Sequence, residues 1–137
     1  MGLLHTLLQQ EHSANLRDQT LEATQPLGLR LPKLLEEAER QNWQDQEVIG
    51  PIFSPACYIE HSVPSVLYLL AKYETDAEQA LIANTEAGGD NCHRGALLGA
   101  LLGAAGGTSV FPSRWIEQLH DKTAILEEIE HFIETLH

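Results

Sequence analysis

Residues 84–107, N-T-E-A-G-G-D-N-C-H-R-G-A-L-L-G-A-L-L-G-A-A-G-G, carry the features that decide the fold of this 137-residue chain. The glycine pair at 88–89 predicts a tight turn, because glycine adopts turn conformations without steric cost. Directly after the pair stand five side chains that can bind a metal or an anion: Asp90, Asn91, Cys92, His93 and Arg94. A run of alanines and leucines follows, in which glycines recur every four residues.

The repeated glycines, Gly95, Gly99 and Gly103, lie on one stripe of the predicted helix, since side chains four apart share a helix face. A glycine inside a helix costs about 1 kcal/mol relative to alanine. Three of them on one stripe therefore predict close packing against another backbone. The start of this helix, held at the polar turn, should favour anions through its free N–H groups and its dipole.

The same stretch resembles a known family. G-G-D-N-C-H-R-G-A-L-L-G-A-L-L-G-A is similar to the C-terminal signature of the ADP-ribosylglycohydrolases (ADP-ribosyl-hydrolase, crystallin J1-like), usually G-G-D-T-D-T followed by a small-residue helix. Y-I-E-H-S-V-P at 58–64, D-A-E-Q-A-L at 76–81 and F-P-S-R-W at 111–115 resemble the family's flanking segments, so the similarity covers roughly residues 48–119. It implies a compact all-α orthogonal bundle, a single domain over residues 1–137 that corresponds to the C-terminal part of such an enzyme.

The resemblance also implies an activity: metal-assisted hydrolysis of an ADP-ribosyl glycosidic bond, with ADP-ribose or an ADP-ribosylated substrate as the partner. In the family, two aspartates of the signature help to hold magnesium. Asp90 matches the first of them, but Cys92 stands in place of the second and His93 in place of a threonine. Magnesium prefers oxygen ligands, so this departure argues against the ordinary two-magnesium site.

The predicted site residues follow from this match, with alternatives for several of them. Asp90 and Glu60 are the predicted catalytic residues, and Asp90 and Cys92 occupy the metal positions. Asp90 is equally suited to be a helix N-cap, and Glu60 to be a solvated helix side chain. The predicted substrate contacts are Asn84, Gly88, Gly89, Asn91, His93 and Arg94; for the arginine, a phosphate and a neighbouring carboxylate are both reasonable partners.

A second hypothesis rests on the residues alone. The only two cysteines, Cys57 and Cys92, are accompanied by His61 and His93. Cys57 and His61 are four apart and share a face if the helix is regular there. Cysteine and histidine suit zinc or another softer metal. The alternative is structural: small buried cysteines, with histidines bonded to the backbone.

Composition limits the remaining possibilities. A formal net charge of -12 argues against nucleic acid or an anionic membrane surface as the partner. The 43% hydrophobic fraction is typical of one globular domain. Two cysteines do not suggest a disulfide framework, so a cytoplasmic location is the default. The longest apolar run, residues 95–107, is shorter than the roughly 20 residues that a membrane-spanning helix needs.

Two motifs of the family's N-terminal half, a G-D-x-x-G turn and an acidic-Thr pair, are not visible in this sequence. We therefore expect a piece of a longer or split protein, completed by an N-terminal half, or a module that no longer hydrolyses its substrate. The alternative function is a non-catalytic ADP-ribose-binding or protein-interaction module. Apolar surface left uncovered by a missing half would favour a homo-oligomer.

The periodicity of apolar residues predicts helices throughout and no strand. Pro26, Gly28 and Pro32 predict a loop at 20–32, and a polar connector spans 43–50 with Val48 and Ile49 as its apolar anchor. Pro64 should kink or split the long central helix, and Asp76 and Asp121 are predicted helix caps. The predicted helices cover residues 3–12, 32–42, 56–73, 76–84, the glycine stretch, a short segment after Pro112, and a last segment from Asp121 with an apolar stripe (Ile125, Ile129, Phe132, Ile133 and Leu136).

Overall fold

The structure, a computed structural model, describes residues 3, 7–8 and 15–135, and within these ranges it contains helices and no strand. The all-α prediction is confirmed. The elements are α2 (Leu16–Thr24), η1 (Gln25–Leu27), α3 (Leu31–Gln41), α4 (Asp45–Val48), η2 (Ile49–Phe53), α5 (Ile59–Lys72), α6 (Ala77–Glu86), α7 (Asn91–Gly106), η3 (Thr108–Val110), α8 (Ser113–Glu117) and α9 (Lys122–Glu134).

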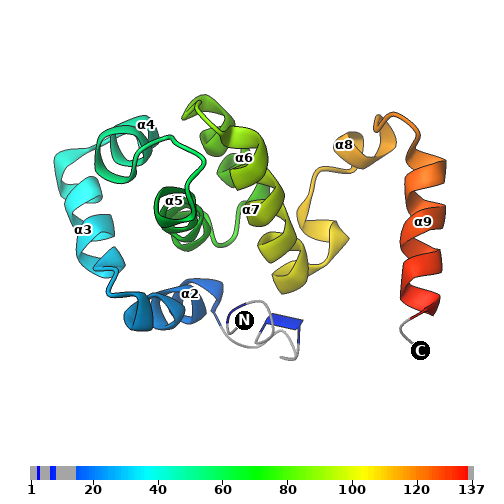
Figure 1. Cartoon of the computed structure of the whole chain (residues 1–137), viewed down its shortest axis with the longest axis horizontal. Helices are drawn as coiled ribbons and strands as arrows, with labels where there is room; N and C mark the ends of the chain where they lie inside the picture. The colour runs from blue at the N-terminus through cyan, green and yellow to red at the C-terminus, as the bar shows by residue number, and fades with distance from the viewer. Residues whose placement is uncertain (1–2, 4–6, 9–14, 136–137) are drawn as a thin grey trace.

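Helix α5 is the centre of the bundle. It is apolar on almost every side, and Val66, Leu69 and Leu70 are completely buried, as expected of a helix surrounded by others. It contacts α2, α3, η2, α6 and α7, and in Figure 1 it is seen nearly end-on while α3 and α6 run across the view. The predicted anchor of the connector, Val48 and Ile49, joins this core and is also fully buried.

The predicted loop at 20–32 is wrong in its first part, where α2 continues to Thr24. The side chain of Asn15 caps this helix by accepting a hydrogen bond from the Arg17 N–H. Thr20 and Thr24 are buried, and each hydroxyl donates to a carbonyl of its own helix. These bonds let polar residues occupy the inner face, so the apolar spacing that signals a helix is weak here.

The boundaries of the later helices are close to the prediction. Helix α5 begins at Ile59 rather than at residue 56, and Pro64 lies inside it without dividing it. Asp76 caps α6 as predicted, accepting a hydrogen bond from the Gln79 N–H at 3.0 Å. Asp121 precedes α9, but its side chain makes no capping hydrogen bond and its backbone is left-handed (φ 55°). A side chain held in that conformation does not reach the first turn, so this capping prediction is wrong.

The glycine stripe of α7 does not pack against another backbone. Gly95 faces the side-chain amide of Asn84, and Gly103 faces the ring of Phe111. A Cβ atom at Gly99 would meet no atom of the described residues within 4 Å. The predicted close packing against another backbone is therefore wrong at Gly95 and Gly103, where side chains fill the space, and no described residue packs against Gly99.

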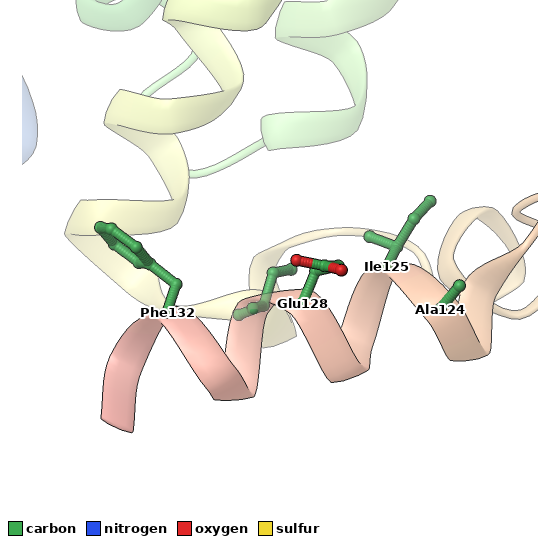
Figure 2. A pocket seen from close by; sticks show the side chains of 5 residues that line it. Ala124, Ile125, Glu128 and Phe132 are labelled. Atoms are coloured by element: carbon green, nitrogen blue, oxygen red, sulfur yellow. The ribbon is translucent and has the colours of Figure 1, made fainter. Parts of the chain in front are cut away.

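Helix α9 lies at the far end of the molecule from α3 (Figure 1), and it contains no buried residue. Its predicted apolar stripe is present as far as Ile133, whereas Leu136 lies outside the described residues. Ala124, Ile125 and Phe132 project from one face of the helix (Figure 2) and line an open groove of about 390 Å³. This face is apolar surface exposed to solvent.

The predicted N-terminal helix at 3–12 falls mostly on residues outside the described ranges; of those that are described, Leu7 is buried and Leu8 is exposed. Among the helices that the structure describes, none is both long and apolar enough to cross a membrane.

Candidate functional site

The polar turn before α7 is fixed by the packing of glycine against a second loop. Gly88 and Gly89 both have positive φ, +66° and +63°. A Cβ atom on Gly89 would lie 2.4 Å from the carbonyl oxygen of Pro55, and the Asp90 N–H donates to that same oxygen at 3.0 Å. Ser54, just before, also has positive φ, 75°. Only glycine fits position 89, and the turn is thereby attached to the loop that leads into α5.

Arg94 holds the turn from beneath. Its side chain is buried, 1% exposed, and its Nη2 donates to the Gly88 carbonyl at 2.6 Å and to the Asn84 carbonyl at 3.4 Å. Nε donates to the Asn84 side chain at 3.1 Å, and Nη1 to the Pro55 carbonyl at 3.5 Å. Burial lowers the pKa of the guanidinium, and the negative charge of Asp90 opposes that shift.

Arg94 is therefore a positioning residue, because all three of its side-chain nitrogens donate to the protein. Its contact with a phosphate stays a prediction. Asn84 is also bonded within the protein, and its predicted contact with substrate likewise stays a prediction. It is 2% exposed, its Oδ1 accepts from Arg94, and its Nδ2 donates to the Asn91 carbonyl at 2.9 Å. The side chain of Asn91 in turn donates to the Thr85 carbonyl at 3.2 Å. These bonds join the end of α6 to the start of α7.

Asp90 stands at the N-cap position of α7, yet its side chain makes no capping hydrogen bond. Its Oδ1 lies 2.6 Å from Nδ1 of His93, a residue whose side chain is largely exposed. Its Oδ2 is buried and has no hydrogen-bond partner among the described residues. The capping alternative is therefore not what the structure shows, and one carboxylate oxygen is left unsatisfied inside the turn.

The hypothesis of a cysteine–histidine metal site loses its geometric basis. Cys57 precedes the first residue of α5, so Cys57 and His61 do not share a helix face; that prediction is wrong because the helix starts later than expected. Cys57 and Cys92 are exposed free thiols, and His61 packs edge-on against Tyr58. Within the described ranges, no group of three or more His, Cys, Asp or Glu side chains could hold a metal.

Glu60 lies in the first turn of α5 and is exposed. No hydrogen bond or ion pair among the described residues joins it to Asp90. Its role as a base stays a prediction.

Two residues of the turn, Asp90 and Asn91, offer oxygen atoms that fit magnesium, whereas Cys92 does not. The free, buried Oδ2 of Asp90 is a hard oxygen donor of the kind that magnesium accepts, and the ion commonly binds one or two carboxylates and fills its other positions with water and substrate oxygens. Asn91 adds an amide oxygen that is in none of the turn's hydrogen bonds described above. Cys92, an exposed thiol, is not a suitable ligand for this ion.

A second polar cluster was not predicted from the sequence. Asp45, 8% exposed, accepts hydrogen bonds from the Tyr68 hydroxyl (2.9 Å), Lys72 Nζ (2.7 Å) and the Tyr73 hydroxyl (2.6 Å). Burial raises the pKa of both tyrosines, and the carboxylate of Asp45 raises it further. The four-residue spacing of Tyr68 and Lys72 was the available signal, since it places both on one face of α5.

A groove between α6 and α8 was also not predicted. It has a volume of about 340 Å³ and is lined by Leu81, Ile82, Thr85, Glu86 and Trp115. The side chain of Trp115 is 36% exposed. The α6 side of the groove ends at Thr85, whose carbonyl binds Asn91.

The described residues form an all-α protein, and its candidate site is the double-glycine turn that places the Asp90 carboxylate at the start of α7. The sequence profile of the ADP-ribosylglycohydrolases matches residues 2–137, and the chain belongs to that family. No curated protein and no solved structure was found to match it.

Proposed function

We infer that this protein binds ADP-ribosyl groups at the turn before α7 and contributes Asp90 to the hydrolysis of their glycosidic bond. The observation that carries the inference is the buried Oδ2 of Asp90, which has no partner among the described residues. Leaving a buried acceptor unsatisfied costs about 1–3 kcal/mol. Such groups in folded proteins call for an explanation, and a ligand that completes the site is one.

The surroundings of Asp90 support a ligand role. The carboxylate could accept a ribose hydroxyl or an ion at Oδ2, while His93 occupies Oδ1 and limits its rotation. The first N–H groups of α7 have no intrahelical partner, and the Asp90 side chain does not cap them. They are available to a diphosphate, which the helix dipole attracts.

Magnesium, if held by Asp90 and the amide oxygen of Asn91, would supply charge stabilisation and an activated water at the anomeric carbon. The residues of this chain bind and orient: Arg94 and Asn84 keep the turn rigid, and Asp90 aligns the ribose. Because Cys92 replaces the second aspartate of the family signature, we expect hydrolysis to need ligands that the turn itself does not supply.

Calorimetric titration of ADP-ribose into the protein, with and without magnesium, tests this proposal. Binding that strengthens with magnesium and falls at least tenfold in Asp90→Asn is expected. Cys92→Asp, which restores an oxygen ligand, should strengthen the magnesium dependence, whereas Cys57→Asp is the matched control and should not. Equal binding in wild type and Asp90→Asn would overturn the role of Asp90.

Hydrolysis is tested separately, by the release of ADP-ribose from an ADP-ribosylated protein. We expect low turnover by this chain and an increase when Cys92→Asp is combined with magnesium. Release by the wild type that Asp90→Asn does not reduce would show that another residue carries the reaction.

The second candidate, a protein-interaction module, is favoured by the exposed apolar stripe of α9. Uncovered apolar surface of this kind commonly marks an interface. Light scattering at high concentration should then show a homo-oligomer that Ile129→Glu dissociates. A monomeric wild type would count against self-association through this helix.

A further inference from the structure

Helix α9 has an apolar stripe that stays open to solvent along its length. Ile125, Ile129 and Ile133 are exposed, and Phe132 is 63% exposed. No residue of the helix is buried. A 13-residue helix is marginal in water by itself, because most helical stability in proteins comes from the packing of an apolar face. The helix therefore has the properties of one that a partner completes.

Glutamates lie along both edges of this stripe. Glu128 lines the same groove as Ile125 and Phe132, as Figure 2 shows. With about 3.6 residues per turn, Glu130 falls on the other edge. The helix carries four glutamates and one lysine, and none of these glutamates forms an ion pair with another described residue. The surface is therefore apolar along its centre and negative along both edges.

We propose that the apolar stripe of α9 is the docking surface for an amphipathic helix of another protein, whose apolar face is flanked by lysine or arginine residues. The apolar side chains of that helix would cover Ile125, Ile129 and Phe132. Its basic side chains would lie against Glu128 and Glu130. Charges at the edges of a helix pair commonly set the choice of partner in this way.

A second copy of this chain fits the stripe less well. When two copies of α9 pair along the stripe, in either direction, the glutamates of one copy meet those of the other. Like charges that face each other across an interface oppose binding. Self-association is therefore expected only at high protein concentration, whereas a basic helix buries the same apolar side chains without that repulsion.

The charge of the whole chain also favours a basic partner. Its formal net charge of -12 attracts a basic segment before contact is made. An anionic membrane surface is repelled by the same charge, and helices that lie on such membranes carry lysine and arginine on their polar face. The glutamates of α9 therefore favour a basic protein helix over a lipid surface.

Two synthetic helical peptides with the same leucine face test the proposal. One carries lysine on both edges of that face, and the other carries glutamate at the same positions. Binding of each fluorescently labelled peptide to the full chain is followed by anisotropy. We expect the lysine peptide to bind at least about tenfold more tightly than the glutamate peptide, because the glutamate peptide places like charges along both edges.

Four variants locate the binding surface. Ile129→Glu should weaken the lysine peptide at least about tenfold, whereas Leu27→Glu, which makes the same kind of change at an exposed position of η1, should not. Glu128→Lys should weaken the lysine peptide and strengthen the glutamate peptide. Glu127→Lys is its matched control, because it makes the same change of charge on the opposite face of α9. Thermal melting checks that each variant is folded.

Salt distinguishes a basic partner from a second copy. Raising the ionic strength from about 0.1 M to about 1 M shortens the screening length from about 10 Å to about 3 Å. Binding of the lysine peptide should weaken, whereas self-association, which brings glutamates together, should strengthen. Light scattering measures the self-association. Equal binding of the two peptides, or self-association that weakens with salt, would overturn the proposal.

The proposal rests on the second candidate function, an interaction surface on α9, and not on the role of Asp90. If Ile129→Glu dissociates the homo-oligomer while the two peptides bind equally, the interaction surface stands and the basic partner is wrong. If Ile129→Glu changes neither self-association nor peptide binding, both are wrong. If Glu127→Lys weakens the lysine peptide as much as Glu128→Lys does, net charge governs the binding and the docking surface is refuted.

Discussion

Two carboxylates of this protein, Asp45 and Asp90, have contrasting surroundings. Asp45 accepts hydrogen bonds from Tyr68, Lys72 and Tyr73, so that both of its oxygens have partners. Asp90 has one partner, His93, and one buried oxygen without any among the described residues. A fully bonded carboxylate stabilises the fold, whereas an incompletely bonded one is kept at a cost in stability. The contrast separates a structural acid from a candidate functional one.

The largest effect on stability is expected from a substitution of Arg94, which holds the turn around Asp90. Replacing it by methionine should lower the free energy of unfolding by about 3 kcal/mol or more, because buried carbonyls lose a charged donor. Chemical denaturation measures this loss. Arg114→Met is the control: its ion pair with Glu78 is open to solvent, with the two side chains 57% and 31% exposed, and its loss should cost about 1 kcal/mol at most. Similar losses in both variants would refute the structural role of Arg94.

The glycine pair, Gly88 and Gly89, tests how the turn around Asp90 is held. Gly89→Ala should destabilise by about 2–4 kcal/mol, combining a left-handed backbone with a clash against Pro55. In Gly88→Ala the new Cβ atom meets no described residue within 4 Å, so we expect only the cost of the left-handed backbone, about 1–2 kcal/mol. Urea titration of both variants measures the difference. If Gly88→Ala were as damaging as Gly89→Ala, contact with Pro55 would not explain the glycine.

The two aspartates can be compared directly by one substitution in each. Asp45→Asn should cost about 2 kcal/mol, because three donors lose a charged acceptor. Asp90→Asn should change the stability by no more than about 0.5 kcal/mol, the usual range where no such feature is lost. Denaturation midpoints at pH 7 provide the measurement. A larger loss for Asp90→Asn than for Asp45→Asn would reverse the assignment of the two roles.

The smallest effect appears only at alkaline pH. Tyr68 and Tyr73 have pKa values raised above the unfolded value of about 10. Their neutral forms are favoured in the folded state, so their contribution to stability is complete below pH 10 and decreases as the pH rises above it. Denaturation at several pH values should show that decrease, and Tyr73→Phe should make it shallower. A free energy of unfolding that stays constant up to pH 11 would contradict the raised pKa values.

The sequence predicted those elements whose structure is determined by residues close together in the chain. The apolar run of α5, the cap at Asp76 and the double-glycine turn are each defined within a few positions, and the structure contains them. Helix α2 was missed because its inner face carries Thr20 and Thr24, whose hydroxyls bond within the helix. The apolar period that would have indicated this helix was therefore absent from the sequence.

Contacts between distant residues could not be predicted in this way. Asp45 belongs to a segment that appeared to be a polar connector, and its partners follow 23 to 28 residues later. The burial of Arg94 depends on the Pro55 loop, 39 positions earlier. Asp90 was identified from its motif, but its unsatisfied oxygen is a property of the packed turn. For these charged residues the sequence predicted the helix or turn in which they lie better than it predicted the residues that they contact.

The attachment of Gly89 to Pro55 has a consequence for how this site can change over evolution. The shape of the turn depends on Gly89, which fits against Pro55, and on the buried side chains of Asn84 and Arg94. It does not depend on Cys92 or His93, which are exposed. Substitutions at these two outward positions should leave the folding free energy almost untouched. Single substitutions at Cys92 or His93 can therefore change which ligand the turn binds without changing the stability or the backbone of the turn.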